Sequence, residues 1–401
     1  MLYEVLGCGS GSMGEAIAWR LLQEEGSVVF VSDQNPKREK ETIEKFKKMP
    51  VASRSRIFGS IGGKGLDILK QKKDLPEIFE NSNMVINALP ASLSPIIAEA
   101  VLQANETRLS PFNDKIHYCD LGGVLETAKK IIFSKLARRA EACGASLVPD
   151  CGLEPGLGNI LAMGMLEHFD LREPLDSLII YVGGLPYNHT QLPLYKKLFN
   201  LKGLEEIYYN RPLVLSGGKP RKIKPLSHYE TMPTGDFDLY FGEKDSDAKF
   251  EAAVTGGLGT LPYYLKSHVL TLQEKTLRFP GHYDLVKYIS QAKFQEIFGK
   301  WLDAYPIQEK DISILKVAAK GKSKITGRQI MIEKIMNVES DENWTSMQKS
   351  TGFTTAVIAK LIAEGKASAG AYPPEIAIPP KLVLDALKKD FSIYERQTPL
   401  L

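Results

Sequence analysis

The sequence predicts an α/β protein in two parts: a doubly wound parallel sheet, followed by an α+β region whose sheet is largely antiparallel. Three observations support this prediction. A cluster of glycines opens the chain between an apolar run and a helical pattern. Strand and helix patterns then alternate with short connections as far as residue 150, and after residue 155 several strand patterns follow one another with no helix between them.

The stretch VLGCGSGSMGEAIAWRLL, residues 5–22, joins a first predicted strand to a helix that begins near Glu15. Its glycines match the G-x-G-x-x-G pattern of a dinucleotide-binding turn, in which one glycine turns the chain, one admits the pyrophosphate and one lets helix and strand pack closely. The helix N-terminus favours an anion there. The alternative is a glycine-rich turn of some other α/β protein. We predict a Rossmann-type region whose cofactor-binding loop consists of Gly9, Ser10, Gly11, Ser12, Met13 and Gly14.

A second buried strand, residues 27–33, ends in Asp33, which follows Gly14 at the spacing of about 20 residues expected for a ribose-binding carboxylate. Such a carboxylate accepts both ribose hydroxyls of NAD and repels the 2′-phosphate of NADP. Lys37 and Arg38 could instead bind that phosphate, but they begin a charged helical pattern that is typical of a solvated face. The predicted cofactor is therefore NAD, with NADP as the alternative.

The strand and helix alternation continues with strands at residues 83–90, 115–123 and 145–152 and helices at residues 94–104 and 126–143. In a doubly wound sheet the ligand lies beyond the carboxyl ends of the strands. We therefore expect the loops after these strands to face the cofactor, with the contacts made by Ala88, Leu89, Pro90, Leu121 and Gly122.

The later part of the chain begins with a helical pattern at residues 156–169 and continues with strand patterns that include a hairpin at 314–336. The polar stretch at residues 231–248 is expected to be an exposed loop. A helix returns at residues 351–365. We therefore predict a nucleotide-binding domain at residues 1–150, a substrate-binding and oligomerisation domain at 151–345, and a C-terminal helical segment at 346–401.

Composition and simple sequence patterns narrow the classes of function that the chain is expected to have. The 401 residues carry a nearly balanced net charge of +3, which gives little reason to expect a nucleic-acid partner. Four cysteines without CxxC spacing favour reduced thiols, and the chain starts without a signal-peptide pattern, so a cytoplasmic protein is expected. No apolar run is long enough for a membrane span, and the histidines lack metal-ligand spacing, so neither a membrane nor a metal is predicted.

Four motifs, VPDCGLEPGLGNILA, YVGGLP, TLRFPGH and STGFTTAVIAKLIAEG, occur in this order, and with them the chain resembles the saccharopine dehydrogenase family, in particular its lysine 6-dehydrogenase branch. The resemblance implies NAD-dependent oxidative deamination at the ε-carbon of L-lysine. The product, allysine, would close to 1-piperideine-6-carboxylate. The resemblance also implies that the C-terminal helical segment packs on the nucleotide domain, and that the protein is a homodimer or homotetramer.

One departure from the family concerns the glycine loop. The family's first strand usually ends in VLGAG-x-x-G, whereas VLGCGSGSMG is two residues longer. Either the strand ends later than in the family, or Gly7 and Gly9 form the turn and the loop bulges.

The implied chemistry requires a neutral amine, because only a nitrogen lone pair can assist loss of hydride from the adjacent carbon. A free ε-amine has a pKa near about 10.4, so the site must desolvate it or supply a base. The substrate carboxylate favours an arginine, and the α-ammonium favours a carboxylate. The predicted catalytic residues are Asp120, His282 and Lys196, and the predicted substrate-binding residues are Arg278, Glu154 and Lys275.

Each assignment has an alternative. Asp120 could hold an ammonium or cap the following turn, and Glu154 could cap the helix at Gly156. Lys275 and Arg278 differ by three positions, so on a strand they point to opposite faces. His282 follows a Pro–Gly turn, where catalytic and surface histidines both occur. The assignment of Lys196 comes from the resemblance, which implies a lysine near substrate.

Two other functions remain open. A saccharopine-forming or saccharopine-cleaving enzyme would act at the same carbon, with a glutamate skeleton on its nitrogen. A protein that senses NAD and regulates a partner would bind the cofactor without chemistry. The loop Asp150–Gly156 is expected to face the cofactor in every case.

Overall fold

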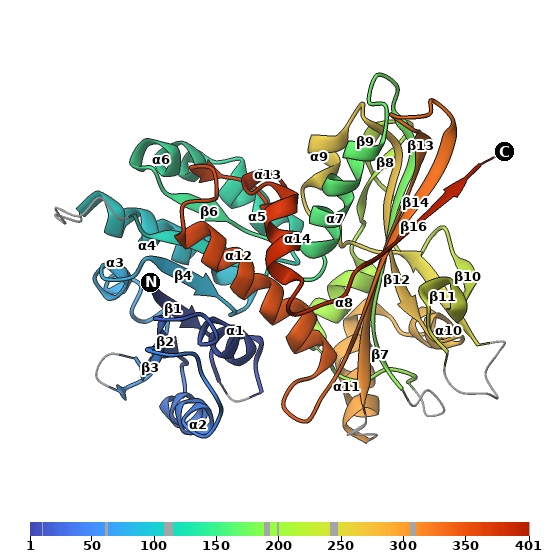
Figure 1. The fold of residues 1–401 in the computed structure, drawn as a ribbon. Helices are drawn as coiled ribbons and strands as arrows, with labels where there is room; N and C mark the ends of the chain where they lie inside the picture. Colours follow the sequence, from blue (N-terminus) through green and yellow to red (C-terminus); the bar gives the residue numbers. More distant parts are fainter. Residues whose placement is uncertain are drawn as a thin grey trace. The chain divides into compact units, whose positions relative to one another are not determined.

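The computed structural model describes residues 1–9, 11–60, 63–107, 115–187, 193–198, 200–240, 248–304 and 310–400. The chain forms two compact units, which Figure 1 shows coloured along the sequence. Met1–Leu157 and Gln348–Leu387 form the first unit, and Gly158–Met347 and Lys388–Leu401 form the second. The final segment, Lys388–Leu401, thus lies with the second unit, whereas the sequence grouped it with the helical segment 346–401.

The first unit is built on a parallel sheet of seven strands in the order β15-β6-β5-β4-β1-β2-β3. The strands are β1 (Leu2–Leu6), β2 (Val28–Ser32), β3 (Arg56–Gly59), β4 (Met84–Asn87), β5 (His117–Asp120), β6 (Ser146–Val148) and β15 (Gly370–Ala371). This confirms the predicted doubly wound sheet. The strand order reverses between β1 and β4, where sheets of this kind bind ligands at the carboxyl ends of the strands.

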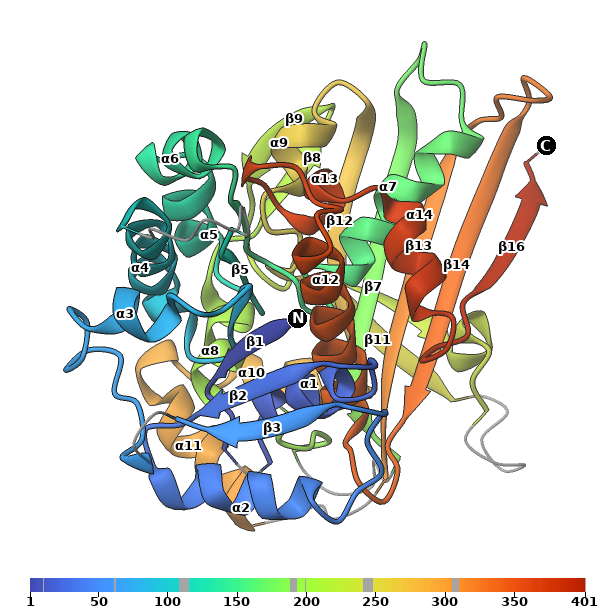
Figure 2. The ribbon, with the colours of Figure 1, turned by 60° about the vertical axis from the view of Figure 1, so that its left-hand side comes forward.

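Helices cover both faces of this sheet. One face packs on α3 (Leu75–Phe79), α4 (Ser94–Thr107), α5 (Leu125–Ile132) and α6 (Lys135–Cys143) through a continuous apolar core. On the other, α12 (Thr354–Ala363) runs along α1 (Met13–Leu21) and crosses β4 and β5, as Figure 2 shows from the side. The turn just before α12 also packs on α1 and requires Gly352, because a Cβ there would lie 2.9 Å from the Cβ of Ala16. Further elements of the unit include α2 (Pro36–Phe46), the π-helical turn η5 (Gln348–Phe353), α13 (Pro374–Ala377) and α14 (Pro380–Leu387).

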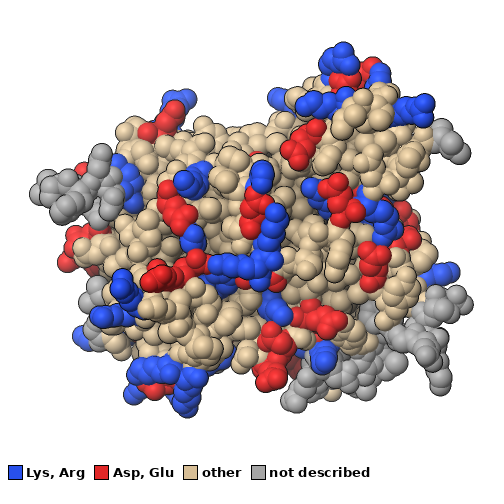
Figure 3. All heavy atoms as spheres, viewed as in Figure 1, with Lys and Arg blue, Asp and Glu red and all other residues tan. Residues whose placement is uncertain are grey.

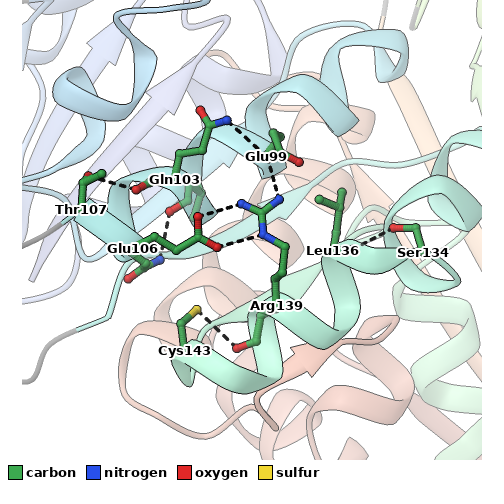
Figure 4. A network of polar contacts seen from close by, with 11 residues as sticks. Glu99, Gln103, Glu106, Thr107, Ser134, Leu136, Arg139 and Cys143 are labelled. Atoms are coloured by element: carbon green, nitrogen blue, oxygen red, sulfur yellow. Dashed lines mark hydrogen bonds and ion pairs between the residues drawn. The ribbon is translucent and has the colours of Figure 1, made fainter.

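The helix predicted at residues 126–143 is two helices. The break comes at Ser134, whose hydroxyl caps α6 by accepting a hydrogen bond from the N–H of Leu136 at 3.1 Å. Gly144, in the left-handed conformation, ends α6. Arg139 of α6 holds both carboxylate oxygens of Glu106 and one of Glu99, which ties α6 to α4 (Figure 4).

The second unit contains a nine-stranded sheet whose main path is β10-β11-β12-β7-β13-β14-β16, with β8 paired to β12 and β9 paired to β8. Only β7 and β12 run parallel, which confirms the predicted largely antiparallel sheet. The strands are β7 (Leu175–Pro186), β8 (Leu213–Ser216), β9 (Lys219–Lys222), β10 (Glu230–Pro233), β11 (Lys249–Val254), β12 (Val269–Arg278), β13 (Asp311–Lys322), β14 (Gln329–Glu339) and β16 (Tyr394–Pro399). The predicted hairpin is β13–β14.

The helices of the second unit include α7 (Leu157–Met165), α8 (Leu201–Tyr209), α9 (Leu261–Leu265), α10 (His282–Lys287) and α11 (Gln291–Ala304). Aromatic side chains dominate the core between α8, α10 and α11. The stretch 231–248 is only partly the exposed loop that was predicted: β10 pairs with β11, and Phe237 is fully buried because the aromatic rings of Tyr181 and Phe250 surround it. Its residues 241–247 lie outside the described residues.

Charged side chains of both signs are interspersed on the face drawn in Figure 3. This pattern agrees with the net charge of +3. None of the helices in the described part of the chain is long and apolar enough to cross a membrane.

Candidate functional site

The glycine loop of the first unit turns at Gly7, two residues before the first glycine of the predicted motif. Strand β1 ends at Leu6, and Gly7 has a φ of +79°, which favours glycine. Gly14 lets α1 approach this turn, because a Cβ on Gly14 would lie 2.6 Å from the carbonyl oxygen of Gly7. The longer loop therefore follows the second alternative, in which Gly7 turns and the loop bulges. The pattern starting at Gly9 was misleading because local spacing does not show where the strand ends.

The start of α1 offers part of an anion site. Ser12 caps the helix, accepting from the N–H of Glu15 at 3.2 Å, and the N–H groups of Met13 and Gly14 have no hydrogen-bond partner among the described residues. The N–H of Gly11 is already bound to the Glu15 carboxylate at 2.7 Å. A diphosphate would thus be held by the first turn of the helix and not by Gly11. The predicted contact Ser10 lies outside the described residues.

The Glu15 carboxylate is itself buried beside this loop, and Lys45 lies 3.1 Å from it. Lys45 therefore offsets the negative charge that Glu15 would otherwise present to a bound phosphate.

Asp33 lies against the glycine loop, as a ribose-binding carboxylate should. It follows β2 directly, and a Cβ on Gly9 would lie 2.7 Å from its Oδ2 and 3.2 Å from Cδ of Arg38. The other oxygen, Oδ1, accepts from the N–H of Asn35 at 2.8 Å, which orients the carboxylate. Gly9 is therefore needed because the two side chains leave no room for a Cβ.

The loop after β4 adjoins the same turn. A Cβ on Gly7 would lie 3.0 Å from the side chain of Leu89 and 3.1 Å from the backbone of Ala88, which Pro90 follows. Asn87 at the end of β4 accepts from the N–H of Leu89 at 3.0 Å. The structure thus brings together the glycine loop, Asp33 and the predicted loop at residues 88–90, so that these residues fit a dinucleotide.

Asp120, at the end of β5, is buried and bound by the protein's own donors. Its Oδ2 accepts from the hydroxyl of Tyr118 at 2.8 Å, and its Oδ1 accepts from the N–H of Asp150 at 3.0 Å. Burial raises the pKa of Asp120, and hydrogen bonds, including one from the backbone N–H of Gly122, oppose that rise. The alternative that Asp120 caps the turn after β5, through Leu121 and Gly122, agrees with these contacts.

Asp150 lies beside Asp120 and was not among the predicted site residues. It has a φ of +67°, and its Oδ1 accepts from the N–H of Gly123 at 3.2 Å. Burial and the charge of Asp120 raise the pKa of Asp150 to about 8. An aspartate at the end of a predicted strand, in a loop expected to face the cofactor, was the signal that could have found it.

Glu154 is half-buried in the loop that leads to α7. The first N–H of that helix, on Leu157, is bound by the carbonyl oxygen of Gly152 at 2.9 Å. Capping of the helix was one of the two roles considered for Glu154. For this N–H group, a backbone carbonyl oxygen fills that role instead.

In the second unit, β12 carries Lys275 and Arg278 on opposite faces, which confirms the prediction from their spacing. Lys275 forms an ion pair with Glu230 at 2.7 Å on β10. Arg278 points instead to the aromatic core beside α8 and α10. The two predicted substrate-binding cations therefore do not line one pocket.

Arg278 is a buried cation that forms no ion pair with a carboxylate in the described part of the chain. Its side chain is 2% exposed, its Nε donates to the hydroxyl of Tyr208 at 2.7 Å and its Nη1 donates to the carbonyl oxygen of Leu277 at 2.7 Å. The guanidinium carbon lies 4.7 Å from the ring centre of Tyr195. It forms no ion pair with any carboxylate in the described ranges. A buried charge in such surroundings is costly unless an anion joins it.

His282 is fully buried and joined to Arg278 through Tyr208. Its Nδ1 lies 2.8 Å from the carbonyl oxygen of Pro193, so Nδ1 donates, and Nε2 accepts from the Tyr208 hydroxyl at 2.8 Å. Burial, together with the charge of Arg278, lowers the pKa of His282 to about 3. His282 is therefore neutral at physiological pH, with both ring nitrogens occupied. These contacts suit a residue that orients Tyr208, which sequence reasoning missed because Tyr208 lies on a separate helix.

Lys196 is 17% exposed at its side chain and forms an ion pair with Asp311 at 2.6 Å. Asp311 also accepts from the N–H of Ser346 at 2.7 Å. The neighbour of Lys196, Tyr195, is the ring beneath Arg278. Among the described residues, no group of three His, Cys, Asp or Glu side chains could hold a metal ion.

Comparison with known proteins places this chain in a family. The model of the saccharopine dehydrogenase C-terminal domain matches residues 152–393. The mitochondrial alpha-aminoadipic semialdehyde synthase of Rattus norvegicus is 28% identical over 127 residues, which cover 31% of this chain and 12% of that protein. The corresponding synthase of Bos taurus is 23% identical over 184 residues, covering 46% of this chain and 17% of that protein. The chain thus matches less than a fifth of either relative.

Among solved structures, the saccharopine dehydrogenase (L-Glu forming) of Saccharomyces cerevisiae has the same fold. It superposes over 100% of both chains with a TM-score of 0.70 at 14% sequence identity. Because the family model spans more than half of the sequence, the chain belongs to the saccharopine dehydrogenase C-terminal domain family.

Proposed function

We propose that this protein is a nicotinamide-dependent dehydrogenase that oxidises a carbon–nitrogen bond at the ε-carbon of a lysine skeleton, with L-lysine as its substrate. The observation that carries the proposal is Arg278, whose buried guanidinium lacks a carboxylate partner within the described residues. A substrate carboxylate would supply the missing charge through paired hydrogen bonds. The names of the similar proteins, which concern saccharopine and an aminoadipic semialdehyde, support the lysine skeleton.

The cofactor would be held by the first unit. The first turn of α1 would bind the diphosphate, and Asp33 would accept the ribose hydroxyls. Asp33 favours NAD over NADP because its carboxylate repels a 2′-phosphate. When bound, the nicotinamide would accept the hydride.

The charges of the second unit favour a substrate with one carboxylate. Among the described residues of this unit, the buried cations Lys275 and Lys316 are paired with Glu230 and Glu333, whereas buried Arg278 forms no ion pair. Lysine has one carboxylate and two amines, whereas saccharopine has three carboxylates and would need further cations. Saccharopine is nevertheless the second candidate, because the matched fold is that of a saccharopine dehydrogenase.

The test is to give the purified protein NAD with L-lysine, then with saccharopine, and to follow NADH by its absorbance. Turnover of L-lysine supports the proposal. Rapid turnover of saccharopine without turnover of lysine would replace the first candidate by the second. Tight NAD binding with no turnover of any amine would instead indicate a nucleotide-sensing protein.

The cofactor preference has a separate test. Asp33→Ala should weaken NAD binding about tenfold and leave NADP binding nearly unchanged, because only NAD uses the carboxylate. The dissociation constants can be measured by calorimetry. Asp74→Ala, at an aspartate that makes no side-chain cap for α3, is the matched control. Equal losses for both nucleotides would show that Asp33 does not bind the ribose.

A further inference from the structure

We propose that Asp150 is the group that takes the proton from the substrate amine, and that Asp120 is its fixed, ionised partner. This inference deepens the proposed function and rests on it. It concerns residues of the first unit only. They lie just beyond the carboxyl ends of β5 and β6, and the glycine loop lies at the same end of the parallel sheet.

The two carboxylates differ in how the protein satisfies them. Both oxygens of Asp120 accept hydrogen bonds, from Tyr118 and from the N–H of Asp150. Donors to both oxygens stabilise the ionised form and leave Asp120 little capacity for a substrate. Asp120 therefore serves as a fixed negative charge beside Asp150.

One of the two carboxylate oxygens of Asp150 is available to accept a hydrogen bond. Its Oδ1 accepts from the N–H of Gly123, but its Oδ2, in a residue only 1% exposed, has no hydrogen-bond partner among the described residues. A buried oxygen without a partner is unfavourable, and such groups call for a ligand or a function. An amine that donates to Oδ2 would satisfy it.

The backbone around Asp150 keeps the carboxyl group in place. Its φ of +67° is in the left-handed region, which is uncommon outside glycine and is often found at functional sites. Gly122, on the adjacent loop, must lack a side chain because a Cβ there would lie 2.0 Å from Oδ1 of Asp150. The orientation of the carboxyl group is thus set by two loops at the ends of β5 and β6.

The titratable groups around Asp150 are acidic or neutral. Asp120 and Tyr118 face it from β5, Cys119 and Cys151 lie next to the two aspartates in the chain, and Glu154 follows in the same loop. Burial and Asp120 raise the pKa of Asp150 to about 8, and burial raises that of the Cys151 thiol. No lysine, arginine or histidine of the described ranges forms an ion pair with Asp150. A substrate ammonium would be the first cation there.

The proposed step is a single proton transfer. An N–H bond of the substrate ammonium breaks, its electron pair stays on nitrogen, and an O–H bond forms at Oδ2 of Asp150. The amine becomes neutral and Asp150 becomes a neutral carboxylic acid, so charge is conserved. Asp150 must be ionised beforehand, so activity should rise as the pH rises through its pKa.

The first experiment needs neither cofactor nor turnover. Protein labelled with ¹³C at the aspartate carboxyl carbon is titrated by NMR, so that the buried glutamates remain silent. We expect the signal of one aspartate to titrate near pH 8 and to be absent from the spectrum of Asp150→Asn. In Asp120→Asn the pKa of this signal should fall by about one unit or more, because the neighbouring charge is lost. A spectrum with every aspartate ionised at pH 7 would overturn the proposal.

Tyr118→Phe provides a second variant if Asp120→Asn does not fold. Loss of the Tyr118 donor disfavours the ionised form of Asp120, so its negative charge acts less on Asp150 and the Asp150 signal should titrate at lower pH. An unchanged titration of Asp150 would contradict the role of Asp120 as its ionised partner.

Kinetics then test the role in the reaction. Asp150→Asn should lower kcat by about 100-fold or more, and Asp120→Asn should move the ascending limb of the pH profile to lower pH. If Asp150→Asn keeps kcat within threefold, the proton role is wrong. If the NMR result holds and neither lysine nor saccharopine turns over, the proposed function fails while the carboxyl pair stands.

Discussion

Lys316 and Arg278 are two buried cations of the second unit, 4% and 2% exposed, with opposite surroundings. Lys316 on β13 forms an ion pair with Glu333 at 2.6 Å and donates to the carbonyl oxygen of Asp236. Among the described residues, Arg278 on β12 forms no ion pair, and its hydrogen bonds go to a phenol and a carbonyl oxygen. The comparison teaches that burial alone does not distinguish a structural charge from a functional one. The ion-pair partner does: a buried charge that is already neutralised has a structural explanation, whereas one without an ion pair is costly to the fold and is therefore the better candidate for binding a ligand.

The largest expected effect is on catalysis. Arg278→Met should lower kcat/KM by about a thousandfold, since two charge-assisted hydrogen bonds to a substrate carboxylate are each worth about 1.5–3 kcal/mol. The melting temperature should stay the same or rise, because the variant removes a buried charge that has no carboxylate partner. Steady-state kinetics and calorimetry measure the two. A lower melting temperature with unchanged kinetics would show that Arg278 stabilises the fold and does not bind substrate.

Lys316→Met should show the reverse pattern. The free energy of unfolding should fall by about 3 kcal/mol, because Glu333 would remain buried with only Arg396, at 3.7 Å, to offset it. Denaturant unfolding measures the change, and Lys316→Met combined with Glu333→Leu should recover most of it. If Lys316→Met and Glu333→Leu lower the free energy of unfolding by similar amounts and the double variant does not recover it, loss of the ion pair does not explain the effect of Lys316→Met.

His282 predicts how stability changes in acid. Its pKa is lowered to about 3 in the folded protein, against about 6.5 when unfolded, so between these values the unfolded chain binds more protons. Its contribution to stability is therefore complete above pH 6.5 and is lost by about 1.4 kcal/mol for each pH unit as the pH falls toward 3.

His282→Gln should make this fall shallower, as measured by unfolding at pH 7, 6 and 5. His117→Asn, in the first unit, is the variant with which His282→Gln is compared, because burial also lowers the pKa of His117, to about 4. An unchanged pH dependence in His282→Gln would show that His282 does not stay neutral in the fold.

The smallest expected effect belongs to Tyr208. Tyr208→Phe removes the hydroxyl that joins Nε of Arg278 to Nε2 of His282, so the guanidinium keeps its charge and loses its alignment. KM should rise about tenfold with kcat within a few-fold, because one hydrogen bond contributes about 0.5–1.5 kcal/mol. Tyr209→Phe, whose hydroxyl binds the carbonyl oxygen of Ile289 instead, is the control. Equal kinetic effects of the two variants would contradict the positioning role.

Local patterns in the sequence were sufficient for much of the fold. Alternating strand and helix periodicity predicted the parallel sheet, and the spacing of Lys275 and Arg278 predicted their opposite faces. Local patterns did not locate the end of β1, so Gly9 was assigned the turn that Gly7 makes. They also merged α5 and α6, because apolar spacing continues across the break that Ser134 introduces.

What the sequence determined by itself is the class of fold and the presence of a glycine loop between the first strand and the first helix, because periodicity and glycine spacing arise from residues close together in the chain. What only the tertiary structure decided is which charges are paired. Lys275 and Lys196 meet carboxylates from distant strands, Arg278 meets none among the described residues, and Asp150 comes to lie beside Asp120. Pairing and burial depend on contacts between residues far apart in sequence, and those contacts separate a structural charge from a reactive one.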